Sequence, residues 1–267
     1  MPGTAVVTGA AGGLGRVLVE RLGRAGYDVV GVDVVGTDRL LDVTDAAACR
    51  ALADELRPSV WINNAGVLGA GDAATQPDDV VDRVIDVNLR GVVHATRAAV
   101  AAMRANGGGH VVQIASLASW VPVPGETVYA ATKAGVLSFT LGLAAELRAQ
   151  GVRDVELSAV CPDGMLTPML TDVLDQDALA LSFSAPRLVT PAQVAERVVE
   201  VLERPRLVAC VPRWRGAQVR LLAAAPDAAL RAAPLFWQQG LRNLQRVRAQ
   251  TSLAERGASI TTGRPSA

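Results

Sequence analysis

This sequence of 267 residues contains few cysteines and carries no formal net charge. The 26 basic residues balance the 26 acidic ones, so no net field would draw the chain to nucleic acid or to an anionic membrane. The three cysteines, Cys49, Cys161 and Cys210, are far apart and odd in number, which is typical of a reducing compartment rather than of a disulfide framework. We therefore expect a cytoplasmic protein without a nucleic-acid partner.

Long apolar runs are also missing. None approaches the roughly 20 residues that a membrane-spanning helix needs, so we expect no transmembrane segment. Met1 leads directly into an apolar strand without a positively charged stretch, and we expect no signal peptide. Half of the residues are nonetheless apolar, which is enough for the large core of a single α/β domain.

Lysine is almost absent, because Lys133 is the single lysine among the 26 basic residues. A lysine ammonium is compact and can hold and relay protons, which an arginine guanidinium cannot. This bias towards arginine predicts that Lys133 holds or relays a proton. The alternative is that a single lysine remains by chance.

Buried strands and amphipathic helices alternate along residues 4–211. Continuous apolar runs predict strands covered on both faces, and apolar residues spaced three and four apart predict helices. We expect Thr44 to cap one helix and Pro191 to begin another. The order predicts an α/β fold, a single-domain, doubly wound parallel sheet of the Rossmann type. The predicted strands are 4–8, 27–33, 60–63, 110–115, 154–161 and 207–211, and the predicted helices are 13–25, 44–57, 78–105, 127–150 and 190–204.

The connection after the second strand departs from this pattern. Asp33 ends one strand and residues 39–42 read as the next, although few residues separate them. A parallel crossover normally takes a dozen or more residues, usually including a helix. We expect this helix to be missing, which leaves that side of the sheet thinly covered. The alternative is that residues 39–42 are not a strand.

The chain from Arg213 onward differs in composition from the rest. Residues 214–225 and 227–250 predict two amphipathic helices, interrupted by Pro226 and Pro234. This extension could add a packing layer, cover a subunit interface, close the substrate site or touch a membrane surface. We divide the chain into a catalytic domain over 1–212, a helical extension packed on it over 213–250, and a flexible tail over 251–267.

Glycines gather between the first strand and the first helix, in Thr8-Gly9-Ala10-Ala11-Gly12-Gly13-Leu14-Gly15. They permit a tight turn and the close approach of a pyrophosphate, which free N–H groups at the helix start would bind. A plain structural turn is the alternative, but the flanking strand and helix, with Asp33 about twenty residues on, favour a dinucleotide site. The expected cofactor contacts in this turn are Gly9, Ala11, Gly12, Gly13, Leu14 and Gly15.

Asp33 ends the second strand, where a carboxylate can bind the hydroxyls of an adenosine ribose. It would repel a 2′-phosphate, and Val34 and Val35 follow it where an arginine would accommodate one. NAD is therefore predicted over NADP. The alternative is a strand-end aspartate that meets only solvent.

Tyr129 and Lys133 lie four residues apart, on one face of the long helix. The pKa of a free phenol is about 10, and a nearby ammonium and an oxidised nicotinamide would lower it. Tyr129 is then predicted to take a proton from an alcohol or to give one to a carbonyl. Ser116 follows a strand at the edge where doubly wound sheets bind ligands, so its hydroxyl is expected to hold the substrate oxygen, with a helix cap as the alternative.

Together these motifs resemble the short-chain dehydrogenase/reductase family over about residues 4–211. The resemblance implies a catalytic tetrad of Asn88, Ser116, Tyr129 and Lys133, in which Asn88 holds a water that links Lys133 to solvent. The matching motifs are Thr8-Gly9-x-x-x-Gly13-x-Gly15, Asp42-Val43, Asn63-Asn64-Ala65-Gly66, Val-Asn88-Leu-Arg-Gly, Ser116, Tyr129-x-x-x-Lys133, and Pro162 through Thr167-Pro168-Met169. The implied cofactor contacts are Asp42, Val43, Asn64, Ala65, Gly66, Tyr129, Lys133, Pro162, Met165 and Thr167.

The resemblance also indicates where a substrate would lie, because the family has a mobile lid at about residues 168–188. Most residues near the predicted site are apolar, so we expect a hydrophobic secondary alcohol or ketone of steroid, terpenoid or aryl type. Where the family has glycine after Pro162, this chain has Asp163, which could order the loop, meet a polar substrate group or be solvated. The expected pocket residues are Ser116, Leu117, Trp120, Val121, Pro122, Val123, Asp163, Gly164, Met165, Met169, Leu170, Leu174 and Phe183.

Members of this family usually pair through the helices at about residues 80–105 and 127–150. Both are rich in alanine here (Ala98, Ala99, Ala101, Ala102, Ala144 and Ala145), so we expect a homodimer or homotetramer. We expect no metal. An NADPH-dependent carbonyl reductase, a non-catalytic NAD(H)-binding regulator and a cofactor-independent interaction protein are the alternatives, but no catalytic side chain is lost, which favours an enzyme.

Overall fold

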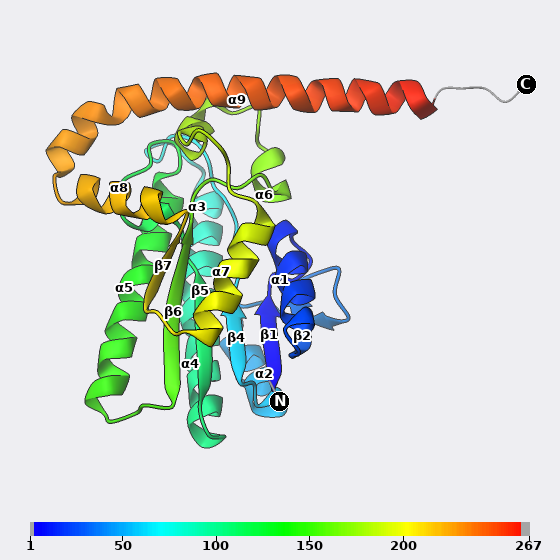
Figure 1. Cartoon of the computed structure of the whole chain (residues 1–267), viewed down its shortest axis with the longest axis vertical. Helices are drawn as coiled ribbons and strands as arrows, with labels where there is room; N and C mark the ends of the chain where they lie inside the picture. The colour runs from blue at the N-terminus through cyan, green and yellow to red at the C-terminus, as the bar shows by residue number, and fades with distance from the viewer. Residues whose placement is uncertain (1–2, 263–267) are drawn as a thin grey trace, which may run out of the picture.

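Seven parallel strands form one sheet in the order β3-β2-β1-β4-β5-β6-β7 (Figure 1). The computed structural model describes residues 3–262, with side chains through residue 251. The strand order reverses at β1, and in such sheets ligands bind beyond the carboxyl ends of the strands at this point. The predicted fold is confirmed. The strands are β1 (Thr4–Thr8), β2 (Asp28–Asp33), β3 (Arg39–Leu40), β4 (Val60–Asn63), β5 (Gly109–Ile114), β6 (Val155–Pro162) and β7 (Val208–Val211).

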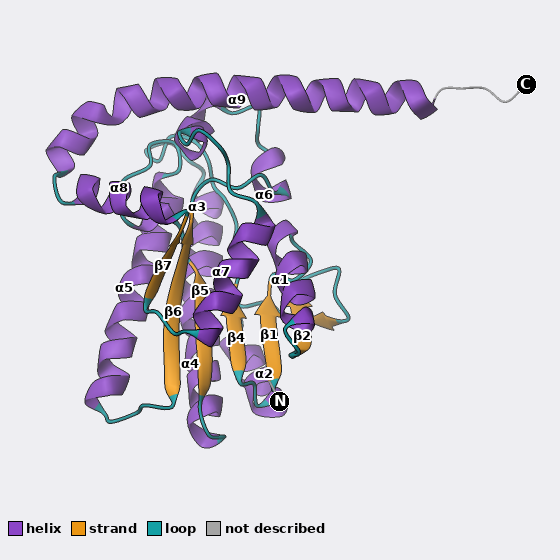
Figure 2. Cartoon of the chain, in the orientation of Figure 1, coloured by secondary structure: helices purple, strands orange, loops and turns teal. Residues whose placement is uncertain are grey.

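Helices cover both faces of the sheet (Figure 2). The longer helices are α1 (Gly13–Arg24), α2 (Ala46–Leu56), α3 (Asp78–Ile85), α4 (Val92–Ala105), α5 (Thr127–Ala149), α7 (Pro191–Glu203), α8 (Arg213–Ala223) and α9 (Pro226–Thr262). The short ones are η1, a π turn (Asp86–Gly91), η2 (Leu117–Ser119), α6 (Pro168–Thr171) and η3 (Asp177–Phe183).

Two apolar layers explain why the strands read as continuous apolar runs. Val7 and Ile62 pack with α1 and α7 on one face of the sheet. Val6 and Trp61, their neighbours in sequence, pack with α2 and α4 on the other face. Because successive strand residues point to opposite faces, a sheet covered on both sides favours apolar residues at successive positions.

The short connection after β2 contains no helix, as predicted. β3 is only two residues long and pairs in parallel with β2, Val32 opposite Arg39 and Asp33 opposite Leu40. Without a covering helix, this edge leaves Val35 and Leu40 about 70% exposed. The sheet is therefore thinly covered beside β2, as expected from the sequence.

The prediction that Thr44 caps a helix is wrong. α2 begins at Ala46, so the capping position falls on Asp45, whose Oδ1 accepts hydrogen bonds from the N–H groups of Ala47 and Ala48 at 2.8 and 3.0 Å. The Thr44 hydroxyl instead donates to Asp42 Oδ1 at 2.7 Å. Aspartate and threonine both suit this position, and where the helix starts decides between them.

The C-terminal extension forms two helices, separated before Pro226 as predicted. Pro234 does not interrupt α9, which continues to Thr262, past the expected end at residue 250. Pro234 lies on an exposed part of the helix, where water can satisfy the carbonyl that loses its partner. Figure 1 shows α9 lying across one end of the molecule and extending beyond it. Residues 263–267 of the expected tail lie outside the described residues.

Within the described part of the chain, α5 is the one helix long and apolar enough to cross a membrane, with a mean hydropathy of 1.3 in its most apolar window. Its Val136 and Leu137 pack in the protein core, as in a core helix of an α/β domain. Of the alanines expected at a subunit interface, only Ala101 and Ala145 are exposed, because the others pack inside their own chain. The dimer stays a prediction.

Candidate active site

The glycine turn between β1 and α1 is wound too tightly for side chains. Gly9 has φ of +66°, and a Cβ on Gly15 would lie 2.0 Å from the Gly9 carbonyl oxygen. No side chain caps the start of α1. Its first N–H groups are therefore free to bind an anion such as a pyrophosphate.

Thr8 and Asn64 attach this turn to the end of β4. Thr8 Oγ1 accepts hydrogen bonds from the backbone N–H groups of Asn64 and Ala65 at 3.1 and 3.0 Å. Asn64 Nδ2 in turn donates to the carbonyls of Thr8 and Gly9 at 2.9 and 3.0 Å. The side-chain nitrogen of Asn64 thus holds the turn in place, which leaves the amide oxygen for a ligand.

Asp33 lies at the end of β2 beside the glycine turn. Its Oδ2 accepts from the Ala11 N–H at 3.0 Å and its Oδ1 from the Val34 N–H at 2.8 Å. Each carboxylate oxygen has room for a second donor, so both are available to the two hydroxyls of a ribose. Asp42 has one oxygen held by Thr44, and Val43 is buried.

Lys133 is buried, with 4% of its surface exposed. Its Nζ donates to the Ile114 carbonyl at 3.0 Å and lies 5.5 Å from the centre of the Tyr129 ring. Burial lowers the pKa of Lys133 to about 8. The ammonium therefore lies beside the phenol and is close to losing its proton at neutral to mildly alkaline pH.

The protein alone raises the pKa of Tyr129, and the lower pKa expected from the sequence, which depends on an oxidised nicotinamide as well as on the ammonium, stays a prediction. Burial raises the pKa of the phenol, the Glu126 carboxylate raises it further, and a hydrogen bond with Ser116 opposes both effects. The surrounding protein thus favours the phenol over the phenolate. Ser116 also accepts from the Ala118 N–H at 3.1 Å as the cap of η2, so the cap role and the contact with Tyr129 occur together.

Asn88 lies in the π turn η1 and is completely buried. Its amide pairs with the backbone of Val67, Oδ1 accepting and Nδ2 donating at 2.8 Å each. A Cβ on Gly66 would lie 3.2 Å from Asn88 Oδ1 and 3.7 Å from Lys133 Nζ. Asn88 is therefore close to the lysine, and π turns of this kind are frequent at functional sites.

One cavity of about 960 Å³ connects the glycine turn with Ser116 and Tyr129. The predicted cofactor and pocket residues line it, except Ala11, Trp120, Leu174 and Phe183, and Asn88 lies behind it. Trp120 instead stacks under the Arg220 guanidinium, whose centre is 4.7 Å from the ring. Leu174 and Phe183 are buried with Leu244 of α9. Trp120, Leu174 and Phe183 are absent from the cavity lining for the same reason. The C-terminal helices pack against them where the substrate was expected.

Two buried polar residues of the cavity were not predicted. Glu126 is 3% exposed and accepts a hydrogen bond from the Ser182 hydroxyl at 2.6 Å, and burial raises its pKa to about 7. Arg215 of α8 forms a buried ion pair with Asp163 at 2.7 Å. Arg215 lies 52 residues from its partner, and no local sequence pattern signals either contact.

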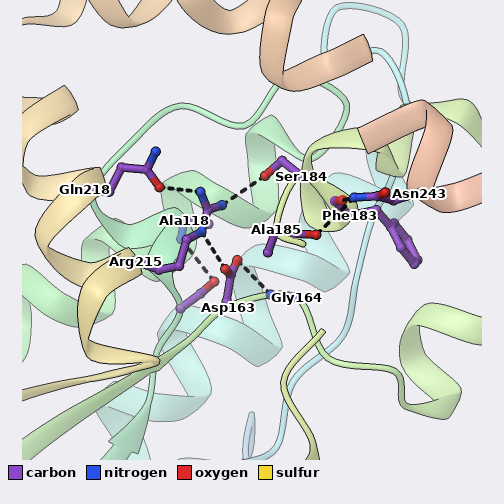
Figure 3. A network of polar contacts seen from close by, with 10 residues as sticks. Ala118, Asp163, Gly164, Phe183, Ser184, Ala185, Arg215, Gln218 and Asn243 are labelled. Atoms are coloured by element: carbon purple, nitrogen blue, oxygen red, sulfur yellow. Dashed lines mark hydrogen bonds and ion pairs between the residues drawn. The ribbon is translucent and has the colours of Figure 1, made fainter. Parts of the chain in front are cut away.

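Figure 3 shows the network around Arg215. Beside its Nε contact with Asp163, its Nη2 donates to Ser184 Oγ at 2.9 Å and its Nη1 to Gln218 Oε1 at 2.6 Å. Asp163 also accepts from the Gly164 N–H at 3.0 Å. Of the roles considered for Asp163, these contacts favour the ordering of the loop, because its carboxylate is neither solvated nor free.

Comparisons with known proteins agree with this geometry. A family model described as "short chain dehydrogenase" matches residues 37–178. The chain is 31% identical over 225 residues to "Oxidoreductase UcpA" of Escherichia coli (strain K12), covering 72% of this chain and 84% of the relative. It is 32% identical over 229 residues to "2-(R)-hydroxypropyl-CoM dehydrogenase" of Xanthobacter autotrophicus, covering 74% and 90%.

Two solved structures share the fold. A short chain dehydrogenase/reductase from Burkholderia phymatum in complex with NAD superimposes with a TM-score of 0.74 at 25% identity, covering 85% of this chain and 95% of that one. A short-chain dehydrogenase from Sphingobium yanoikuyae in complex with NADPH gives 0.70 at 26%, covering 86% and 95%. Similar chains thus bind either nicotinamide cofactor.

The raised pKa of Glu126 should make the folded state less stable as the pH rises. Between its usual pKa of 4.5 and about 7, the folded chain keeps a proton that the unfolded chain loses, so the free energy of unfolding falls across this window. The contribution of this one group is roughly 3 kcal/mol at most. We expect Glu126→Gln to remove it, as measured by urea unfolding between pH 5 and 8. Ser182→Ala, which keeps the carboxyl, should retain the pH dependence, and an unchanged slope in Glu126→Gln would refute the assignment.

Proposed function

The chain belongs to the short-chain dehydrogenase family, and from that premise we propose that it is an NAD-dependent oxidoreductase acting on a hydrophobic secondary alcohol and the matching ketone. The observation that carries the proposal is the grouping of Ser116, Tyr129 and the buried Lys133 around one cavity that also reaches the glycine turn. NADPH-dependent carbonyl reduction is the alternative within the family.

The residues around the glycine turn fit a dinucleotide. A Cβ on Gly9 would lie 2.7 Å from the Ala65 Cα, so the turn lies close against β4, and the uncapped start of α1 would hold the pyrophosphate. The Asp33 carboxylate would hold the adenosine ribose, and Lys133 the nicotinamide ribose. When bound, the nicotinamide supplies the chemistry that this chain lacks, which is to accept or deliver a hydride.

The chain's own residues would handle the proton and position the substrate. The Ser116 hydroxyl would hold the substrate oxygen next to the Tyr129 Oη, since these two side chains are hydrogen-bonded to each other. Tyr129 would take the alcohol proton during oxidation and return it to the carbonyl during reduction. The Lys133 ammonium would stabilise the phenolate, and Asn88 would connect Lys133 with water near Gly66.

The substrate side of the cavity supports an apolar substrate. Leu117, Val121, Val123, Met169 and Leu170 line it next to Ser116. A sugar-like substrate would leave several hydroxyl groups without partners against these side chains, which costs binding free energy. A hydrophobic alcohol or ketone is therefore the proposed substrate class.

Tyr129→Phe should abolish turnover, because it removes the proton-transfer group and little else. Absorbance of the reduced nicotinamide is followed during incubation with NAD and a panel of hydrophobic secondary alcohols, and with NADH and the matching ketones. We expect turnover by the wild type, a loss of at least about 100-fold in the variant, and unchanged NADH binding by fluorescence. NADH binding without turnover of any wild-type substrate would favour a non-catalytic regulator.

Asp33→Ala should relax the preference for NAD. Removing the carboxylate removes both the ribose contact and the repulsion of a 2′-phosphate. The ratio of kcat/KM with NAD to that with NADP should fall at least about tenfold. Val35→Ala, two residues further on and outside the cavity lining, serves as the control and should leave the ratio unchanged. A wild type that already prefers NADP would contradict the assignment.

A further inference from the structure

The two C-terminal helices each direct one face into the active-site cavity. On α8 this face consists of Arg215, Val219 and Leu222, at spacings of four and three residues. On α9 it consists of Ala229, Ala233 and Phe236, at the same spacings, with Leu230 beside them. Residues so spaced lie above one another on one side of a helix, so each helix lines the cavity along two turns.

α8 is fixed to the ends of two neighbouring strands, β5 and β6. Val219 packs in one apolar cluster with Ala115 and Leu117, the residues that flank Ser116. The Arg215 guanidinium forms its buried ion pair with Asp163, directly after Pro162 at the end of β6 (Figure 3). Removing one partner of a buried pair leaves an uncompensated charge, so the position of α8 is strongly determined.

α9 is fixed on the segment at 174–185. Asn243 Nδ2 donates to the carbonyls of Phe183 and Ala185 at 2.9 and 3.0 Å (Figure 3). A Cβ on Gly240 would lie 1.8 Å from the Ala180 carbonyl oxygen, so the helix touches η3 backbone to backbone. Leu244 is fully buried against η3. The stretch between the two anchors, from Val219 to Phe236, therefore closes one end of the cavity.

On the basis of the proposed function, we infer that α8 and the first turns of α9 are the specificity wall of the substrate site. Leu222, Ala233 and Phe236 would contact the part of the substrate remote from the reacting carbon. Arg215 is the one charged residue among those of α8 and α9 that line the cavity. It already donates to Asp163, Ser184 and Gln218 and offers little to a polar group. The wall thus selects alcohols and ketones that carry a bulky apolar group.

Filling the wall tests this role, and the chain provides matched controls. Leu222→Trp and Ala233→Trp place an indole in the cavity from different helices. Leu221→Trp and Leu235→Trp make the same change beside them, at residues that are 75% and 70% exposed and do not line the cavity. kcat/KM is measured for 1-(2-naphthyl)ethanol and for 2-butanol, with NADH binding by fluorescence as the check of folding.

For both wall variants, kcat/KM for the naphthyl alcohol should fall at least about tenfold relative to that for 2-butanol. In the control variants this ratio should stay within about twofold of the wild type. Wall variants that bind NADH and keep the wild-type ratio would overturn the inference and leave the proposed function intact. A wild type that binds NADH but oxidises neither alcohol and reduces neither ketone would overturn the proposed function, and the inference with it.

Discussion

The burial of the Lys133 ammonium is the constraint on which the rest of the site depends. A charged group with so little contact with water is stable only where the fold supplies partners. Here the partner is the Ile114 carbonyl at the end of β5, which requires α5 to cross that end in one register. The same register places Tyr129 one helical turn before Lys133 and brings Ser116, two residues after Ile114, to the phenol.

Two opposing influences on Tyr129 follow from this arrangement. Burial and the Glu126 carboxylate favour the neutral phenol, whereas the hydrogen bond with Ser116 favours the phenolate. An ammonium 5.5 Å from the centre of the ring, as on Lys133, also favours the phenolate on general electrostatic grounds. Groups with such opposed influences are typical of acid and base sites, where the pKa has to suit both directions of proton transfer. Ser182, in η3, donates a hydrogen bond to Glu126. The carboxyl group that acts on Tyr129 is therefore also in contact with η3.

The extension completes the site rather than merely covering it. Its ion pair with Asp163 explains the aspartate found where the family has glycine, because the carboxylate is the anchor for α8. Its residues Gly240 and Asn243 fix η3, which lies in the segment where the resemblance implies a mobile lid. The chain thus adds to the family core a C-terminal extension, which we propose forms one wall of its substrate site.

The sequence predicted what depends on neighbouring residues and missed what depends on distant ones. Strands, helices, the short connection before β3 and the spacing of Tyr129 and Lys133 are all local patterns, and they were predictable. The capping position moved from Thr44 to Asp45 because propensity does not fix where a helix starts. Trp120 and Phe183 were placed in the pocket because nothing in their surroundings indicates that α8 and α9 pack over them.

The most direct test of the account is deuterium transfer with Lys133→Met, which keeps the length of the side chain but removes its charge. The substrate is a hydrophobic secondary alcohol that the wild type oxidises, with deuterium on its carbinol carbon and NAD at a saturating concentration. Mass spectrometry of the reduced cofactor then measures how much deuterium has been transferred. The account predicts labelled cofactor with the wild type and, over the same time, almost none with the variant. Transfer by Lys133→Met at the wild-type rate would contradict it, because the buried ammonium would then not be needed for the reaction.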